Sequence, residues 1–102
     1  MAKLFAIYQQ PKDGAAFEAH YFNKHVPLAK AMPGLLSYEI TRGDVTGVAG
    51  KHAVYLVGIL EFESISAIHA ALASPQGQAA AADLANFADA GVDLMMCDTQ
   101  ML

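Results

Sequence analysis

One histidine stands in a run of apolar and aromatic residues whose spacing is that of a helix face. Phe17, Tyr21, His25, Leu28 and Met32 follow one another at intervals of four, four, three and four residues, which places their side chains on one side of a helix. An imidazole takes up and releases protons near neutral pH, and an apolar wall with aromatic neighbours suits a small organic ligand. The spacing therefore favours His25 as a general base or acid beside a bound ligand.

Two neighbours bear on that prediction. Pro27 has no N–H to bond back to Asn23, so we expect a bend or a restart of the helix near His25. Tyr21 lies one turn earlier on the same face and can hydrogen-bond His25, fix its tautomer, or bond a ligand carbonyl. The alternative role for His25 is structural, as a core histidine satisfied by a backbone carbonyl exposed near the proline.

The ligand-binding candidates come from the same helix and from the predicted strands. Phe17 and Leu28 share the face of His25, whereas His20 lies roughly 140° away on a straight helix and is expected at the surface or on the rim of the site. Tyrosines in strands more often pack than bind, but each can point a hydroxyl into a cavity. The strand tyrosines are Tyr8, Tyr38 and Tyr55, of which the last two complete the set of ligand-binding candidates.

The sequence predicts neither a metal site nor a bound cofactor. His20 and His25 are five residues apart rather than the four of a zinc-binding helix, and His52 and His69 lack a carboxylate at ligand spacing. Cys97 is the only cysteine, so one chain cannot build a cysteine cluster. No glycine-rich loop opens a helix to hold phosphate. The late aspartates form no recognisable carboxylate pair, and most are expected to be solvated: Asp83, Asp89, Asp93 and Asp98.

Composition and charge exclude several classes of protein. The formal net charge is -4 and the six basic residues form no stripe, which argues against a nucleic-acid partner. No apolar run approaches the ~20 residues of a membrane span, and no signal peptide is recognisable. With a single cysteine, a reducing cytoplasm fits best. Hydrophobic residues make up 55% of the 102 residues, which suggests a covered surface, most simply a partner subunit.

The pattern along the chain predicts a single domain over residues 1–102. We expect strands at 3–8, 36–41, 52–62 and 92–99, and long helices at 13–32 and 74–90. A short helix follows the N-cap Ser64, and Ser74 followed by Pro75 is a second cap signature. A glycine-rich loop at 43–50 joins the two middle strands. This order is that of the α+β ferredoxin-like βαββαβ subunit, a four-stranded antiparallel sheet with helices on one face.

Two of the predicted strands are apolar on both faces. The helices cover only one face of such a sheet, so the other face of 3–8 and 52–62 must meet something else. The economical solution is a second copy packed sheet against sheet, with a cavity between sheet and helices or between the two sheets. We therefore predict a homodimer that encloses a small hydrophobic ligand.

Four segments together resemble the EthD family. They are YxxP at Tyr8 to Pro11, FxxHYxxxHxPLA at Phe17 to Ala29, PGL at Pro33 to Leu35, and SPQGQAAAADLANFADAGV at Ser74 to Val92. That family belongs to the dimeric α+β barrel superfamily of ferredoxin-like subunits, so the resemblance, over nearly the whole chain, implies the same fold and a dimer. It also implies that His25 is the family's histidine before the proline, and that His20 and Tyr21 are its histidine-tyrosine pair.

The resemblance implies a bacterial role in small-molecule catabolism or secondary metabolism. The family is named after a gene found beside a cytochrome P450 system that degrades ethyl tert-butyl ether. Related fungal domains resemble dehydratases or cyclases, and sister families are cofactor-free monooxygenases, isomerases and haem-degrading enzymes. Together with the residues, this favours a cofactor-independent enzyme acting on an apolar carbonyl or phenolic compound, with His25 as general base or acid and Tyr21 orienting it or the ligand. A non-catalytic accessory protein that holds a ligand for an oxygenase, and a purely structural dimer, stay open as alternatives.

Overall fold

Four antiparallel strands and one layer of helices build the fold. A computed structural model describes residues 1–102, and its sheet has the strand order β2-β3-β1-β4. The strands are β1 (Ala2–Gln9), β2 (Ser37–Ile40), β3 (Val54–Phe62) and β4 (Val92–Asp98). The helices are α1 (Gly14–His20), α2 (Val26–Lys30), α3 (Ile65–Ala73) and α4 (Pro75–Asp83), and a π-helical turn (Tyr21–His25) joins α1 to α2.

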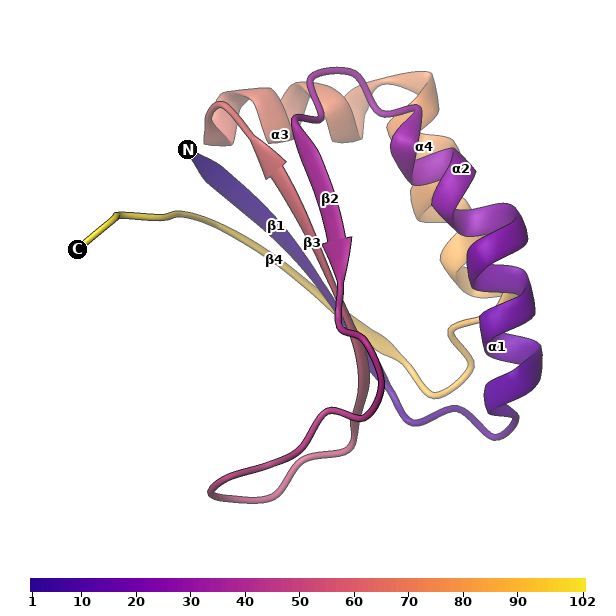
Figure 1. Ribbon diagram of the computed structural model, residues 1–102. Coiled ribbons are helices and arrows are strands. Elements are labelled where there is room, and N and C mark those ends of the chain that lie inside the picture. Colours follow the sequence, from indigo (N-terminus) through magenta and orange to yellow (C-terminus); the bar gives the residue numbers. More distant parts are fainter.

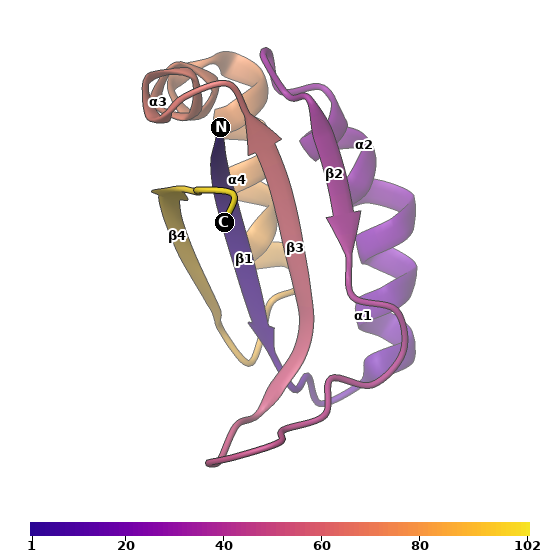
Figure 2. The same cartoon turned by 60° about the vertical axis from the view of Figure 1, so that its left-hand side comes forward.

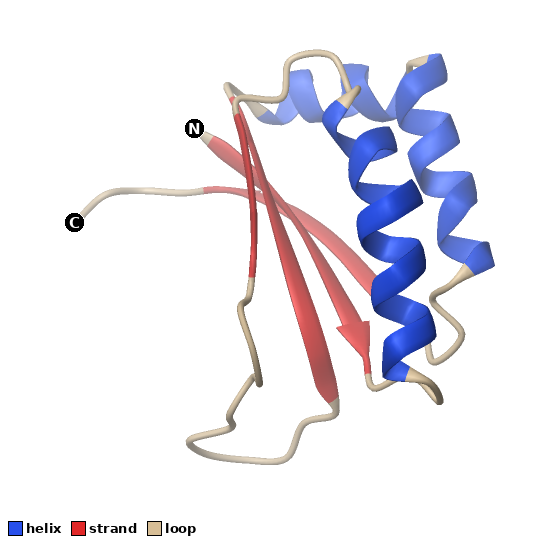
Figure 3. Ribbon diagram, turned by 45° about the vertical axis from the view of Figure 1, so that its right-hand side comes forward, coloured by secondary structure: helices blue, strands red, loops and turns tan.

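The helices all lie on one side of the sheet (Figure 1, Figure 3). Figure 2 shows the sheet from its other side, with β4, β1, β3 and β2 next to one another and the helices behind them. This arrangement confirms the predicted ferredoxin-like fold. None of the helices combines the length and the apolarity needed to cross a bilayer.

The two central strands bury one face against the helices and leave the other half-buried. Burial alternates strictly along β1, so that Ala2, Leu4, Ala6 and Tyr8 face the helices. The residues between them point to the opposite side, which we call the open sheet face. Its apolar members are neighbours across the strands: Phe5, Ile7, Val57, Ile59 and Met95.

Serine caps begin the two later helices, as predicted. The Ser64 hydroxyl accepts a hydrogen bond from the Ala67 N–H at 3.1 Å, and the Ser74 hydroxyl accepts one from the Gly77 N–H at 3.0 Å. Ser74 also ends α3, so α4 starts close against it. A Cβ atom on Gly77 would overlap the carbonyl oxygen of Ala71, which explains why a glycine occupies the first turn of α4.

The last long helix is shorter than predicted. We expected it to run to Ala90, but α4 ends at Asp83 and a 3-10 turn (Leu84–Asn86) follows. Phe87 then leaves helical geometry, with φ at -143°, and its ring lies 5.2 Å from the ring of Phe17. Packing of this aromatic side chain in the core outweighs the helix propensity of the alanines around it.

The first helix contains a π-helical turn at the point where a bend was predicted. The Val26 N–H bonds to the Tyr21 carbonyl, five residues back, in place of the usual four. Pro27 cannot donate to the Asn23 carbonyl and its ring would crowd that oxygen in a regular helix, so the wider turn accommodates the proline without ending the helix. The turn holds one residue more than an α-helical turn. Every later side chain is therefore rotated about the helix axis by about 100° from the position that it would have in a regular α-helix.

That rotation determines which residues of α2 are buried. Ala29 and Met32 face the sheet, whereas Leu28, predicted on this face, is only half-buried. The core between helices and sheet forms two adjoining clusters. One gathers mostly aliphatic residues around Leu60 and Ile68. The other is mainly aromatic and contains Tyr8, Phe17, Tyr21 and Phe87 together with Ala6 and Leu56.

Candidate functional site

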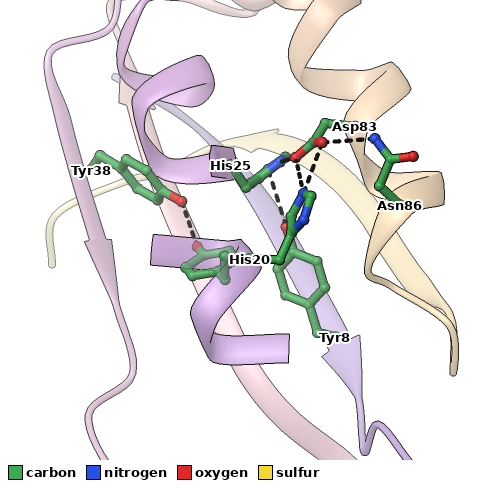
Figure 4. Close-up of polar contacts among 7 residues, drawn as sticks. Tyr8, His20, His25, Tyr38, Asp83 and Asn86 are labelled. Atoms are coloured by element: carbon green, nitrogen blue, oxygen red, sulfur yellow. Dashed lines mark hydrogen bonds and ion pairs between the residues drawn. The ribbon is translucent and has the colours of Figure 1, made fainter. Parts of the chain in front are cut away.

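His25 is held at the boundary between the two core clusters. It ends the π-helical turn, its residue is 6% exposed, and its side chain lines a cavity between the helices and the sheet. Its ring packs 4.9 Å from the ring of Phe87 and 5.6 Å from that of Tyr21. Figure 4 shows the imidazole between a tyrosine from β1 and a carboxylate from α4. Both ring nitrogens therefore have a partner.

Those partners determine the tautomer of His25. Nδ1 lies 3.0 Å from Oδ2 of Asp83, and an ionised carboxylate only accepts hydrogen bonds, so Nδ1 carries the proton. Nε2 of the neutral ring is then an acceptor, and the Tyr8 hydroxyl donates to it at 3.4 Å. This second bond is long and therefore weak, so Nε2 is the ring nitrogen that can accept a proton from another group.

Asp83 receives hydrogen bonds from three side chains. Besides His25, they come from His20 Nε2, at 2.9 Å to Oδ1, and from Asn86 Nδ2, at 3.0 Å to Oδ1. Burial raises the pKa of Asp83, but the hydrogen bonds from Asn86, His20 and His25 outweigh it and keep this pKa below its ordinary value. The carboxylate is therefore charged at neutral pH although its residue is only 7% exposed.

The opposite balance holds for His25. Burial lowers the pKa of the imidazole, and the hydrogen bond and charge of Asp83 offset that effect only in part. His25 is thus neutral at pH 7, the form in which an imidazole accepts a proton. Asp83 is placed to stabilise the imidazolium that such a transfer would create.

A pair of tyrosines adds hydroxyl groups to the same region. The hydroxyls of Tyr21 and Tyr38 are hydrogen-bonded to each other, and Tyr38 lines the cavity. Burial raises the pKa of both phenols, and it raises that of Tyr8 as well. The three phenols keep their protons at neutral pH and can donate hydrogen bonds. Gly58 lies beneath the pair, where a Cβ would be 3.5 Å from the Tyr21 hydroxyl oxygen.

The cavity is small and mostly apolar. It has a volume of about 50 Å³, enough for a few water molecules, and twelve of its fourteen lining residues are hydrophobic. The lining residues with polar groups in their side chains are Tyr8, His25 and Tyr38. Leu94 of β4 also lines it and is 49% exposed, so this side chain stands where the cavity meets solvent. No group of three or more His, Cys, Asp or Glu side chains is arranged to hold a metal ion.

The predicted site residues lie in three places. His25 and Tyr38 line the cavity, with Tyr21 directly behind Tyr38, but the Tyr21 hydroxyl bonds Tyr38 and not His25. His20 reaches Asp83 from the outer side of α1. The others do not line the cavity: Phe17 is in the aromatic core, Leu28 is half-buried on α2, and Tyr55 donates to Glu18 at 2.7 Å near the surface.

Asp83 is the principal residue that the sequence reasoning missed. We expected most of the late aspartates to be solvated; Asp89, Asp93 and Asp98 are exposed, and Asp83 is the buried exception. A signal was present, because Asp83 lies three residues after Ala80 and four before Phe87, on the apolar face of its helix. A charged residue at such a position needs a buried partner. Tyr8 carried no comparable signal beyond its place in an apolar strand.

Comparison with known proteins shows the family. The EthD domain matches residues 9–91. An uncharacterized 11.0 kDa protein in the thcB-thcC intergenic region of Rhodococcus erythropolis is 38% identical over 100 residues, which cover 98% of this chain and 96% of that protein.

Solved structures agree with that match. The crystal structure of an EthD family protein from Bacillus halodurans C-125 has a TM-score of 0.88 at 33% identity, and the match covers 98% of this chain and 99% of that one. A dimeric ferredoxin-like protein of unknown function from Thermobifida fusca has a TM-score of 0.68 at 15% identity, covering 96% and 90% of the two chains, which is a likeness of fold. The chain belongs to the EthD family.

Proposed function

We propose that this protein binds a small apolar carbonyl or phenolic compound in the cavity and moves a proton on it with His25, without a cofactor. The family and the ferredoxin-like fold support a function related to small molecules. The observation that carries the proposal is the hydrogen-bonded line Tyr8–His25–Asp83, which ends on the cavity wall. An oriented neutral imidazole with a carboxylate behind it is the arrangement that proton transfer needs.

In the proposed step, Nε2 of His25 takes a proton from an acidic C–H or O–H bond of the ligand. The bonding electrons stay on the ligand as an enolate or phenolate, and the new imidazolium is paired with Asp83, 3.0 Å away. For this step the Tyr8 hydroxyl must rotate away from Nε2. Because its hydrogen bond to Nε2 is long, breaking that bond costs little free energy. The proton then returns to the same or another ligand atom, so that no oxidant or reductant is required.

Tyr38 is the residue we assign to the ligand oxygen. Its side chain belongs to a residue that lines the cavity, and the hydroxyl keeps its proton because burial raises the pKa of the phenol. If Tyr21 donates to the Tyr38 oxygen, the Tyr38 proton is free for a ligand oxygen on which negative charge develops. Tyr21 then acts through Tyr38 as a positioning residue. A ligand larger than a few waters also requires side chains such as Leu94 to move aside.

The test begins with native mass spectrometry of the purified protein, which identifies a retained ligand. That compound, or a simple enolisable ketone or phenol if none is retained, is then incubated with the protein in D₂O, and exchange of its acidic proton is followed by NMR. We expect His25→Gln to slow exchange by roughly 10²–10⁴-fold. Tyr55→Phe, whose hydroxyl lies outside the cavity, is the matched control. Equal rates for wild type and His25→Gln would refute the proposed chemistry.

A second candidate is a non-catalytic ligand-binding protein. It is favoured by one observation, that the Tyr8 hydroxyl already occupies the basic nitrogen of His25. His25 would then contribute only a hydrogen bond, and His25→Gln would weaken binding without abolishing any reaction. Ligand retention by wild type with no exchange in D₂O selects this candidate over the first.

We also propose a homodimer formed through the open sheet face. Five apolar side chains lie together there, and the Thermobifida fusca protein of the same fold is dimeric. Ile59 is central, because it pairs with Phe5 of the neighbouring strand. Size-exclusion chromatography with light scattering tests this: wild type should be a dimer, Ile59→Lys a monomer, and Ala79→Lys on the exposed side of α4 a dimer. A monomeric wild type would overturn the proposal.

A further inference from the structure

Asp83 is shared by two imidazoles that differ in their access to solvent. The side chain of His25 is 7% exposed and that of His20 is 27% exposed, yet both donate to the same carboxylate, which carries one negative charge (Figure 4). His20 approaches from α1 and also lines a recess on the surface, whereas His25 lines the inner cavity. The carboxylate thus joins an inner and an outer proton-binding group.

The hydrogen bonds leave one place for an extra proton on each ring. Nε2 of His20 lies 2.9 and 3.1 Å from the two carboxylate oxygens and must carry a proton, because the carboxylate only accepts. Neutral His20 can therefore gain a proton only at Nδ1. By the same reasoning, neutral His25 can gain one only at Nε2. Either event creates an imidazolium whose nearest negative charge is Asp83.

We propose that His20 is the solvent-facing positioning residue of the site: it shares the charge of Asp83 with His25, so that a proton on His20 keeps His25 in its neutral, proton-accepting form. One carboxylate balances one imidazolium. A second imidazolium in the same cluster would be a largely buried charge without a counter-ion, which is strongly unfavourable. A proton on one ring therefore disfavours a proton on the other.

Inside the fold, no charged side chain other than Asp83 contacts His25. His25 faces the Tyr8 hydroxyl from β1, Asp83 from α4 and the Phe87 ring, which is uncharged. The Asn86 amide, which follows α4, donates to Asp83 and carries no charge. Outside His20, the recess has one cation, Lys12, and two exposed carboxylates, Asp13 and Asp89. Those carboxylates lie on the solvent side of His20, away from the cavity that His25 lines. The charge of His20 also contributes to the lowered pKa of His25, after burial.

The consequence for function rests on the proposed role of His25. When His25 takes a proton from a ligand, the charge of Asp83 is needed inside, and His20 releases its own proton to water. The base thus stays available in mildly acidic solution, and its proton is balanced at the surface rather than in the cavity. The coupling itself does not depend on any ligand.

NMR titration of the histidine ring signals in the full chain, without ligand, tests the coupling. His20→Gln keeps an N–H donor for Asp83 but cannot become charged, so we expect the titration midpoint of His25 to move to higher pH. His69→Gln makes the same chemical change at an exposed position on α3 and should leave that midpoint unchanged. The exposed His52 is an internal reference in every sample. The same His25 midpoint in all three proteins would overturn the proposal.

A second variant covers the case in which His20→Gln disturbs the fold. Asp83→Asn removes the shared charge but keeps the shape, and both rings should then take up protons only at lower pH. A decrease confined to His25 would contradict the sharing. Because these titrations need no substrate, a protein without exchange activity can still show the coupling. Conversely, an active protein with independent midpoints would refute this inference and leave the proposed function intact.

Discussion

Nδ1 of His25 lies 3.0 Å from Oδ2 of Asp83, although 58 positions separate the two residues in the chain. The first comes from the π-helical turn and the second is the last residue of α4, so the contact ties these two helical segments together above the sheet. Both side chains are buried, so if either one were removed, water could not readily reach the other to form a substitute hydrogen bond. The contact therefore both holds the two helical segments together and fixes the tautomer of His25.

Removing the carboxylate should destabilise the fold. Asp83→Ala leaves the buried Nδ1–H of His25 without an acceptor, and we expect the free energy of unfolding to fall by about 1–3 kcal/mol. Asp83→Asn keeps one acceptor oxygen and should cost less. Urea denaturation at one fixed protein concentration measures both, with the exposed Asp89→Ala as the control, expected within about 0.5 kcal/mol of wild type. Equal costs at positions 83 and 89 would contradict the assigned role.

His25 should make stability depend on pH. Its folded pKa lies below the ordinary 6.5, so between these two values the unfolded chain binds more protons than the folded one. The free energy of unfolding then rises with pH, which means that stability is full above about 6.5 and is lost as the pH falls toward the folded pKa. Urea midpoints at several pH values between 5 and 8 should fall less steeply on acidification for His25→Gln than for wild type. Identical slopes would rule out His25 as the source.

The start of α4 should tolerate no side chain at position 77. In Gly77→Ala the new Cβ meets the backbone carbonyl of Ala71, which cannot rotate away, so the two helices must separate. Overpacking of this kind costs roughly 1–3 kcal/mol, more than the helix propensity of alanine restores. Thermal or urea unfolding measures the loss, and Gln76→Ala, exposed in the same turn, is the control. A stabilised Gly77→Ala protein would show that the helices have room to move.

The tyrosine pair should show a measurable coupling. Tyr21→Phe and Tyr38→Phe each remove one hydroxyl of a partly buried hydrogen bond, and each is expected to cost about 0.5–1.5 kcal/mol. The double variant should cost less than the sum, because the second substitution removes a group that has already lost its partner. As a control, Tyr55→Phe replaces Tyr38→Phe in this double-mutant cycle. The unfolding free energies lost in Tyr21→Phe and Tyr55→Phe should add up in the double variant, because the Tyr55 hydroxyl bonds Glu18 and not Tyr21.

Much of the fold was accessible from local sequence patterns. The continuous apolar residues of β3 and the serine caps at Ser64 and Ser74 are signals carried by a few neighbouring residues, and the structure confirms them. The end of α4 was not accessible in this way. It depends on Phe87 packing against rings from β1 and α1, contacts that no local pattern records.

Two residues of the candidate site could be predicted from the sequence, but their hydrogen-bond partners could not. His25 and Tyr38 could be placed near a cavity because their spacing sets the face of the element that carries them. Their partners could not, since pairing with Asp83 and Tyr21 depends on how distant elements meet. Asp83 shows that one ionisable residue on an apolar helix face is worth a search for its counterpart elsewhere in the chain.

The π-helical turn makes the length of the first helix as important as its composition. Deleting one residue between Tyr21 and His25, such as the exposed Asn23, would restore a regular α-helix there. Because each residue advances an α-helix by about 100°, the deletion would shift the segment before the turn against the segment after it, so that either Phe17 or Ala29 leaves the buried face. Most single substitutions at Asn23 should be tolerated, whereas insertions and deletions in this turn should not.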